Sequence, residues 1–301
     1  MTGKITGTDL ILNRDGSIYH LQLKPGELAG TIILVGDPAR VGQVSSHFDT
    51  IDVEKKNREF LTRTGTFRGK LLSVMSTGIG PDNMEIVLNE MDALFNIDLN
   101  SREIKQNQAC LELIRIGTSG LVHRDIDPGS VILTEMAGGL DGVYHFYRDE
   151  YSHNIGKISE AFIRHTGWNP LLPEPYFIRA SEKLMDRICK PGWFRGITLS
   201  TPGFYAPQGR SLRLSPLDAV LLEKIRTFKY GSMRIQNFEM ESSVLYALSA
   251  MMGHEAVTVC AGIANRETKN MLEEYKDSMD SLIVDVLEKL IINDPSQSQG
   301  T

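Results

Sequence analysis

The hydrophobic positions of this chain gather in short, nearly continuous runs that recur at wide intervals. The runs are rich in β-branched residues. This pattern is typical of strands that are buried on both faces of a sheet. The runs cover residues 31–35, 71–75, 113–116, 130–133, 196–199 and 256–260.

Between several of these runs the spacing of apolar residues changes to that of a helix, which predicts amphipathic helices. The clearest helical patterns cover residues 84–94, 244–251 and 272–291, and Pro81-Asp82 supplies a start for the first of them. Strands alternating with helices predict an α/β fold with a central mixed, largely parallel β-sheet flanked by helices. No linker divides the chain, so we expect one domain over residues 1–293 and a disordered polar tail over 294–301.

Charge and composition narrow the classes of function. The 301 residues include 38 acidic and 32 basic side chains, a net charge of −6, which argues against a broad basic face for nucleic acid. No apolar run is long enough for a membrane span or a signal peptide. The scattered Cys110, Cys189 and Cys260 lack the spacing of a disulfide framework or a zinc site. We therefore expect a cytoplasmic protein without a metal centre and with no membrane partner.

Candidate chemistry follows the first and third apolar runs, because ligands of open α/β sheets bind beyond the carboxyl ends of the strands. These runs lead into Gly36-Asp37-Pro38-Ala39-Arg40 and Arg115-Ile116-Gly117-Thr118-Ser119-Gly120. Glycines beside hydroxyls suggest a turn whose backbone N–H groups bind an anion, and guanidinium groups offer paired donors to phosphate. Together with Arg58, the two stretches predict a phosphate site. Each alone is more simply explained as a tight turn or a surface charge, because short patterns often occur without a function.

Two later stretches suggest a nucleoside. Gln208 and Arg210 are two positions apart, so in an extended loop they project to the same side. An amide next to a guanidinium matches the O–C–N–H edge of a pyrimidine, although a plain polar loop fits as well. Glu241 precedes a predicted helix, where a carboxylate either interacts with the helix dipole or holds the vicinal hydroxyls of a ribose, with Met240 against the sugar.

These motifs resemble those of the uridine phosphorylases of the nucleoside phosphorylase superfamily. Most matching stretches are common to the superfamily, whereas Gln208 and Arg210 in the pattern F-Y-x-x-Q-x-R resemble the part specific for uracil. The matches run in family order across nearly the whole chain: Tyr19-His20-Leu21, Gly36 to Arg40, Arg58-Glu59-Phe60, Ser76 to Gly80, Arg115 to Gly120, Phe204 to Arg210, Glu239 to Ser242 and Asn265-Arg266.

The resemblance implies reversible phosphorolysis of uridine or a related pyrimidine nucleoside, with inorganic phosphate as co-substrate. It assigns phosphate binding to Gly36, Arg40, Arg115 and Thr118, and to Arg58 from a neighbouring subunit. It assigns the ribose to Met240, Glu241 and Glu239, with His20 of the neighbour closing over the sugar. It assigns the base to Phe204, Gln208 and Arg210, the last two also acting in catalysis.

Because His20 and Arg58 resemble residues donated by a neighbour, the minimal unit implied is a homodimer; assembly into a hexamer is left open. The resemblance implies no cofactor. A monovalent cation near Glu59, which some members bind, is left open because Pro81-Asp82-Asn83 replaces a smaller sequence of the relatives.

Three alternatives stay open: a purine nucleoside phosphorylase, a hydrolytic nucleosidase of the same fold, and a non-catalytic nucleoside-binding protein. The stretch Ala261 to Arg266 lacks the carboxylate with which purine-acting relatives protonate their base, which favours pyrimidines. The Arg residues favour phosphate over water as nucleophile, because a water nucleophile would leave their charges uncompensated.

Overall fold

All six apolar runs lie in strands of one mixed sheet in the computed structural model, which describes residues 4–292. The strands that contain them are β1 (Thr31–Val35), β4 (Lys70–Ser76), β7 (Glu112–Leu121), β8 (Val131–Gly139), β10 (Phe194–Ser200) and β13 (Glu255–Asn265). β1 is buried along its whole length, as a continuous apolar run predicts. The predicted tail over 294–301 lies outside the described residues.

Further strands complete the sheet, and the sequence patterns did not indicate them. They are β2 (Val53–Asn57), β3 (Phe60–Phe67), β9 (Tyr176–Arg179), β11 (Lys229–Tyr230) and β12 (Met233–Glu239). A separate small hairpin pairs β5 (Ile97–Asp98) with β6 (Glu103–Ile104).

The strand order is β11-β12-β10-β8-β13-β7-β1-β4-β3-β2, with β9 beside β8. Parallel pairing joins β1 to β4 and β7, β7 to β13, and β10 to β8 and β12, whereas the other pairs are antiparallel. The predicted mixed sheet is therefore confirmed. β12 also pairs with β7, through Phe238 and Gly120, so β12, β10, β8, β13 and β7 close into a ring. This closure brings the end of β12 next to the end of β7.

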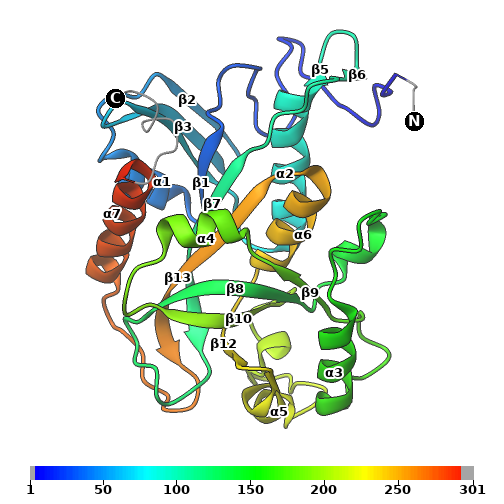
Figure 1. The fold of residues 1–301 in the computed structure, drawn as a ribbon, viewed down its shortest axis with the longest axis vertical. Coiled ribbons are helices and arrows are strands. Elements are labelled where there is room, and N and C mark those ends of the chain that lie inside the picture. Colours follow the sequence, from blue (N-terminus) through cyan, green and yellow to red (C-terminus); the bar gives the residue numbers. More distant parts are fainter. Residues whose placement is uncertain (1–3, 293–301) are drawn as a thin grey trace.

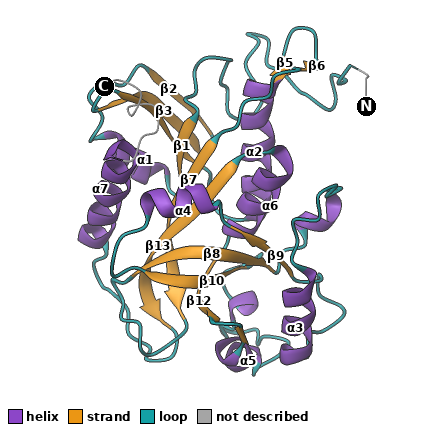
Figure 2. Ribbon diagram, viewed as in Figure 1, coloured by secondary structure: helices purple, strands orange, loops and turns teal. Residues whose placement is uncertain are grey.

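Helices cover the sheet on both sides (Figures 1 and 2). α2 and α6 pack against each other at one side, and α4 and α7 pack against each other at another. The helices are α1 (Pro38–Ser45), α2 (Pro81–Asn96), α3 (Gly156–Thr166), α4 (Glu182–Ile188), α5 (Leu221–Thr227), α6 (Ser242–Met252) and α7 (Lys276–Ile292), with the 3-10 helices η1 (Val143–Phe146) and η2 (Ala206–Gln208).

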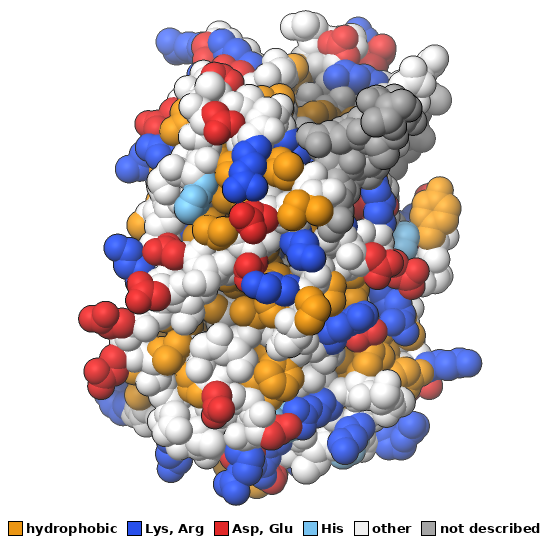
Figure 3. All heavy atoms as spheres, turned by 60° about the vertical axis from the view of Figure 1, so that its left-hand side comes forward, with side chains coloured by type: hydrophobic (Ala, Val, Ile, Leu, Met, Phe, Trp, Pro, Cys, Tyr) orange, Lys and Arg blue, Asp and Glu red, His pale blue; other side chains and the backbone are white. Residues whose placement is uncertain are grey.

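The predicted start of the terminal helix at Leu272 is wrong, because α7 begins at Lys276. The Leu272 N–H donates to the carbonyl of Ile263 at 2.9 Å, so this segment folds back on β13 instead of coiling. Within residues 4–292 no helix is long and apolar enough to cross a membrane. On the face in Figure 3, acidic and basic side chains are interspersed.

Candidate active site

A cavity of about 1100 Å³ lies where the carboxyl ends of β1, β10 and β12 meet the stretch of β7 from Arg115 to Gly120. It brings together predicted site residues from segments far apart in the sequence. Those that line it are Gly36, Arg40, Arg115, Thr118, Phe204, Gln208, Arg210, Glu239, Met240 and Glu241. Ring closure of the sheet explains the meeting, because it places the β12 end beside β7.

The predicted turn at Gly117 to Gly120 is wrong: these residues belong to β7 and pair with β13. On the other edge of β7, pairing with β1 ends at Arg115 and pairing with β12 begins at Gly120. Between these two points the edge of β7 borders the cavity, which Thr118 and Ser119 line. A gap between two partner strands, in place of a turn, exposes this stretch to a ligand.

Arg115 folds back along β7 and lies over Gly117. A Cβ on Gly117 would be 2.0 Å from Arg115 Nη1, so glycine is what allows this path. Arg115 Nη2 donates to Glu241 Oε2, and Nη1 lies 3.5 Å from Glu239 Oε2. Burial lowers the pKa of Arg115, but the carboxylates of Glu241 and Glu239 outweigh it, and the pKa is raised above its ordinary value. The guanidinium is a fixed cation in the cavity wall.

Arg40 supplies a second buried guanidinium beside Arg115. It stands in α1, whose first turn is capped by Asp37 accepting from the Ala39 N–H at 2.8 Å. Its Nη1 donates to the Ile116 carbonyl at 3.5 Å, and within the described chain it has no carboxylate partner. Burial, and then the charge of Arg115, lower the pKa of Arg40. A buried cation without a counter-ion is costly, which marks this end of the cavity as an anion site.

Two buried carboxylates lie beside Arg115 and have different surroundings. Glu239 accepts from the Glu241 N–H at 3.0 Å, from the Ser242 N–H at the start of α6 and from the Ser200 hydroxyl. Glu241 accepts from the Gly80 N–H at 2.7 Å and from Arg115, and burial raises its pKa. Glu239 is thus occupied by bonds that begin a helix, which leaves Glu241 as the carboxylate better placed for a ligand.

Gln208 and Arg210 meet, although their loop is not extended as predicted. The chain forms the 3-10 helix η2 and ends it at Gly209, with φ +70°. Arg210 Nη1 donates to Gln208 Oε1, and its Cζ lies 3.7 Å from the centroid of the Phe204 ring. Gln208 Nε2 donates to Thr201 Oγ1 at 3.0 Å. An amide and a guanidinium are therefore held side by side in the cavity wall.

Arg266 belongs to the same part of the cavity and had no predicted role of its own. Its Nη2 donates to the Gln208 carbonyl at 3.0 Å, and Nη1 is buried without a partner among the described residues. Burial lowers the pKa of Arg266; burial and the charge of Arg266 lower the pKa of Arg210 to about 10. The signal in the sequence that could have identified Arg266 as a site residue is its position directly after the last buried strand.

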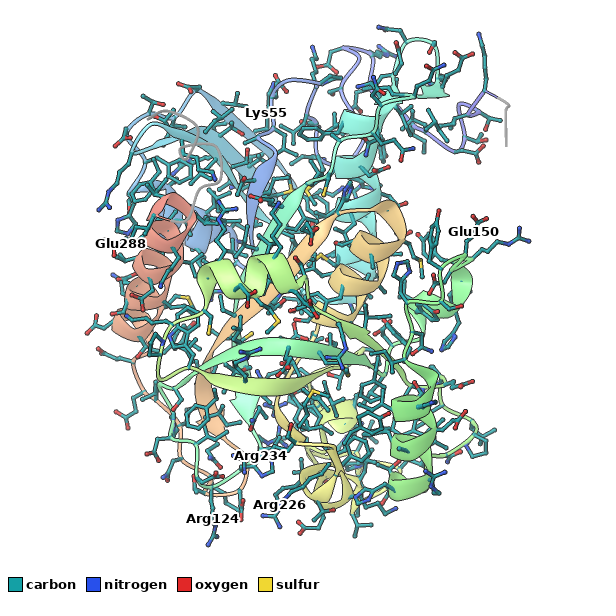
Figure 4. All side chains as sticks on the ribbon, viewed as in Figure 1. Lys55, Arg124, Glu150, Arg226, Arg234 and Glu288 are labelled. Atoms are coloured by element: carbon teal, nitrogen blue, oxygen red, sulfur yellow. The ribbon has the colours of Figure 1, made fainter. Side chains whose placement is uncertain are left out.

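The loop after Arg266 is anchored by ion pairs at the end of the molecule where Figure 4 labels Arg124 and Arg226. Glu267 lies 2.9 Å from the Arg124 guanidinium and 2.5 Å from that of Arg226. These contacts hold the backbone next to Arg266 in place.

Arg115 lies at one point along β7, and the pair Arg210 and Arg266 lies at another. Arg115 lies over Gly117, whereas a Cβ on Gly120 would be 3.7 Å from Arg266 and 3.9 Å from Arg210. Three strand residues span about 10 Å. The cavity is therefore elongated, with an anion site at one end and an amide flanked by guanidinium groups toward the other.

His20 and Arg58 do not line the cavity. They nevertheless lie together, because Asn57, the neighbour of Arg58, donates its side-chain N–H to the His20 carbonyl at 2.9 Å. His20 Nδ1 contacts Glu90 at 2.7 Å, and Arg58 sits in a tight turn with φ +54°. Both residues thus occupy one surface region outside the cavity of their own chain.

Comparisons with known proteins agree with this geometry. The family model described as "Phosphorylase superfamily" matches residues 31–288. A uridine phosphorylase of Thermococcus kodakarensis is 30% identical over 269 residues, 89% of this chain and 84% of that protein. A DeoD-type purine nucleoside phosphorylase of Streptococcus suis is 26% identical over 277 residues, 90% of this chain and 98% of that protein.

A solved structure matches this chain along most of its length. The Trypanosoma brucei nucleoside phosphorylase, described as showing uridine phosphorylase activity, superposes with a TM-score of 0.83 at 28% identity, covering 94% of this chain and 100% of that one. A uridine phosphorylase of Phytophthora capsici shares the fold, with a TM-score of 0.68 at 21% identity over 96% of this chain and 99% of that one. The family model, the relatives and the fold agree: the chain belongs to the phosphorylase superfamily and is a nucleoside phosphorylase.

Proposed function

We propose that this nucleoside phosphorylase is a uridine phosphorylase, which cleaves uridine reversibly with phosphate to uracil and ribose 1-phosphate in pyrimidine nucleoside salvage. One observation carries the proposal: a single cavity holds the Arg40–Arg115 pair and, farther along β7, the Gln208–Arg210 pair. The names of the T. kodakarensis relative and of the T. brucei structure support the same substrate.

The anion end would hold the nucleophile. Cleavage of an N-glycosidic bond builds positive charge on the sugar, as in other glycosyl transfers. Phosphate held by Gly36, Arg40, Arg115 and Thr118 stabilises this charge and then captures C1′, so positioning removes part of the barrier. Phosphate also supplies the negatively charged partner that the Arg40 guanidinium lacks within the described chain. Arg58 of a neighbouring subunit completes this phosphate site.

The far end of the cavity would stabilise the leaving base. Uracil departs with negative charge on its carbonyl oxygens, and Arg210 and Gln208 are fixed donors next to that position. Arg266 adds a second guanidinium, with a free buried Nη1 among the described residues. Phe204 packs against the base. No acid is required to protonate uracil, because the guanidinium groups of Arg210 and Arg266 stabilise the negative charge of the leaving base.

Between these groups the ribose would contact Met240 and Glu241. Glu241 accepts hydrogen bonds from the ribose hydroxyls once phosphate draws Arg115 toward itself. Glu239 contributes indirectly, because its carboxylate accepts from the backbone N–H groups of Glu241 and Ser242 and so holds the backbone at Glu241 in place. His20 of the neighbouring subunit closes over the sugar.

The proposed enzyme is a cytoplasmic homodimer, with one domain over residues 1–293 and no cofactor besides the co-substrate phosphate. Neither nucleic acid nor a membrane is proposed as a partner. Sizing of the purified protein distinguishes a dimer from a hexamer, and a catalytically competent monomer would contradict the shared site.

A product assay tests the proposal. Uridine, thymidine and inosine are incubated with the protein in buffers with and without phosphate, and bases and sugars are separated. We expect uracil and ribose 1-phosphate from uridine, with no cleavage when phosphate is absent. Free ribose without phosphate would indicate a hydrolase, preference for inosine would indicate a purine phosphorylase, and tight uridine binding without turnover would indicate a binding protein.

A further inference from the structure

Thr201 follows β10 directly and is fully buried, and it does not line the cavity. Its backbone N–H donates to the Glu239 carbonyl at 3.0 Å, which ties it to β12. Its hydroxyl nevertheless contacts Gln208, one of the two groups proposed to bind the base. The position of that hydroxyl is fixed by the sheet.

The single proton of the Thr201 hydroxyl is already engaged. Oγ1 donates to the Gly203 carbonyl at 3.0 Å, with the Glu239 carbonyl as a longer second acceptor at 3.4 Å. A hydroxyl has one proton and two lone pairs, so toward Gln208 this oxygen acts as an acceptor. It therefore requires the NH₂ group of Gln208, which lies 3.0 Å away, and not the carbonyl oxygen.

The other end of the Gln208 amide meets the opposite requirement. Arg210 Nη1 donates to Gln208 Oε1, and a guanidinium has donors only. If the amide turned over, its NH₂ group would face the Arg210 donors and its oxygen would face a hydroxyl whose proton is engaged. Both hydrogen bonds would be lost, so Thr201 and Arg210 together permit one orientation.

This orientation decides what the base must present. Arg210 uses one lone pair of Oε1 and leaves the other for a ligand. A site with a free amide oxygen beside a guanidinium accepts a ring N–H that neighbours a carbonyl, as in uracil. Cytosine offers an unprotonated ring nitrogen and an amino group there, which places acceptor against acceptor and donor against donor.

We propose that Thr201 is a positioning residue that fixes the Gln208 amide and thereby sets the selection of uridine over cytidine. The inference rests on the proposed function and adds a residue that touches no substrate. A site built to bond a substrate N–H rejects analogues that lack it by about 10⁴-fold or more. The Thr201 hydroxyl is needed for that selectivity because it prevents the amide from turning over.

The test compares the KM for uridine with the inhibition constant of cytidine in wild-type protein and in Thr201→Val, Thr201→Ala and Thr201→Ser. Loss of the hydroxyl leaves a buried NH₂ group unpaired, so we expect kcat/KM for uridine to fall about 10- to 100-fold. The ratio of the cytidine inhibition constant to the uridine KM should fall about tenfold or more in both variants without the hydroxyl, Thr201→Val and Thr201→Ala. Thr201→Ser restores both values, and the KM for phosphate stays unchanged.

Thr198→Val is the matched control, because Thr198 lies in β10, the strand that Thr201 directly follows, and is equally buried. Its hydroxyl bonds Thr134 and Asn237, each at 2.7 Å, and does not reach Gln208. This variant loses buried hydrogen bonds but keeps the wild-type selectivity ratio. An unchanged ratio in Thr201→Val and Thr201→Ala, or equal narrowing in Thr198→Val, overturns the assignment of Thr201 alone. Absence of phosphate-dependent uridine cleavage in the wild-type protein overturns the proposed function itself, and the Thr201 role with it.

Discussion

Gly117→Ala tests how the sheet positions the phosphate site without changing any polar group. The new Cβ would be 2.0 Å from Arg115 Nη1, 2.9 Å from Arg115 Cζ and 3.2 Å from Cys260 Sγ. Gly117 does not adopt a positive φ, so alanine brings no backbone strain. The methyl group and the Arg115 guanidinium cannot share this space, and the guanidinium must leave its path along β7.

The displacement breaks the contact of Arg115 with Glu241 and removes a donor from the anion site. A hydrogen bond to a charged group contributes about 1.5–3 kcal/mol, and each 1.36 kcal/mol corresponds to about tenfold. We expect kcat/KM for phosphate to fall about 10- to 100-fold. Breaking a buried ion pair outright costs about 3–5 kcal/mol, so the free energy of unfolding falls as well.

The assay varies phosphate at saturating uridine and measures uracil binding separately, because the base contacts lie elsewhere on β7. Gly120→Ala is the control on the same strand: its Cβ would meet no atom nearer than 3.7 Å. We expect a raised phosphate KM in Gly117→Ala alone, with uracil affinity retained. A phosphate KM within about twofold of wild type in a folded Gly117→Ala protein would refute this reasoning, since the lost contact should exceed that factor.

Arg210→Ala should lower kcat at least about a hundredfold, as removal of an oxyanion donor does, and near-normal turnover would remove Arg210 from the mechanism. Burial lowers the pKa of Arg210 to about 10, so its charge is present below that pH and is lost as the pH rises through it. Activity should therefore fall on the alkaline side, and it should fall at lower pH in Arg210→Lys, because the ordinary pKa of lysine, about 10.4, is below that of arginine and the same burial lowers it further. Uridine ionises identically in both assays, so coincident pH profiles would contradict the assignment. Arg58→Ala and Arg115→Ala subunits are mixed in equal amounts and refolded together. If each site of a two-fold dimer uses Arg115 of one subunit and Arg58 of the other, roughly a quarter of all sites should regain both residues and their activity. No recovery of activity would place Arg58 outside the site.

The central strands were predictable because each contains a short, nearly continuous apolar run. Burial on both faces leaves only apolar residues in β1 after Thr31, so its boundaries could be read from the run Thr31–Val35 alone. β2 is an edge strand whose sequence Val53–Asn57 contains three charged residues, and nothing in its hydrophobicity marks it. Its place in the sheet comes from antiparallel pairing with β3, a tertiary contact that a local pattern does not record.

β12 was missed for a different reason. Gln236, Asn237 and Glu239 are buried polar residues of this strand, and they interrupt the apolar run that marks a buried strand. Asn237 Oδ1 accepts from the Thr198 hydroxyl, and Glu239 accepts from the Ser242 N–H at the start of α6, so the acceptor groups of both residues have partners inside the fold. Asn237 Nδ2 is buried without a partner among the described residues. A strand that ends in a functional site carries polar side chains, and hydrophobic patterning then fails.

The residues of the site were more predictable than its backbone. Arg40, Arg115, Gln208 and Arg210 were all predicted to share one site, and all line the cavity. Arg40, Gln208 and Arg210 come after buried strands, as predicted, whereas Arg115 lies within β7. The turn at residues 117–120 was predicted wrongly, since two glycines suggested a turn. Gly117 instead makes room for Arg115 within a strand. Only the three-dimensional path of that side chain reveals this reason for a glycine.

The most direct measurement is a crystal structure of the protein with phosphate and uridine, or with uracil and ribose 1-phosphate. We predict phosphate within hydrogen-bond distance of the Arg40 and Arg115 guanidinium groups, and the base bonded through its N–H to Gln208 Oε1 with Arg210 at a neighbouring carbonyl. A phosphate bound elsewhere, or a nucleobase that leaves Gln208 and Arg210 in contact with solvent, would contradict the account.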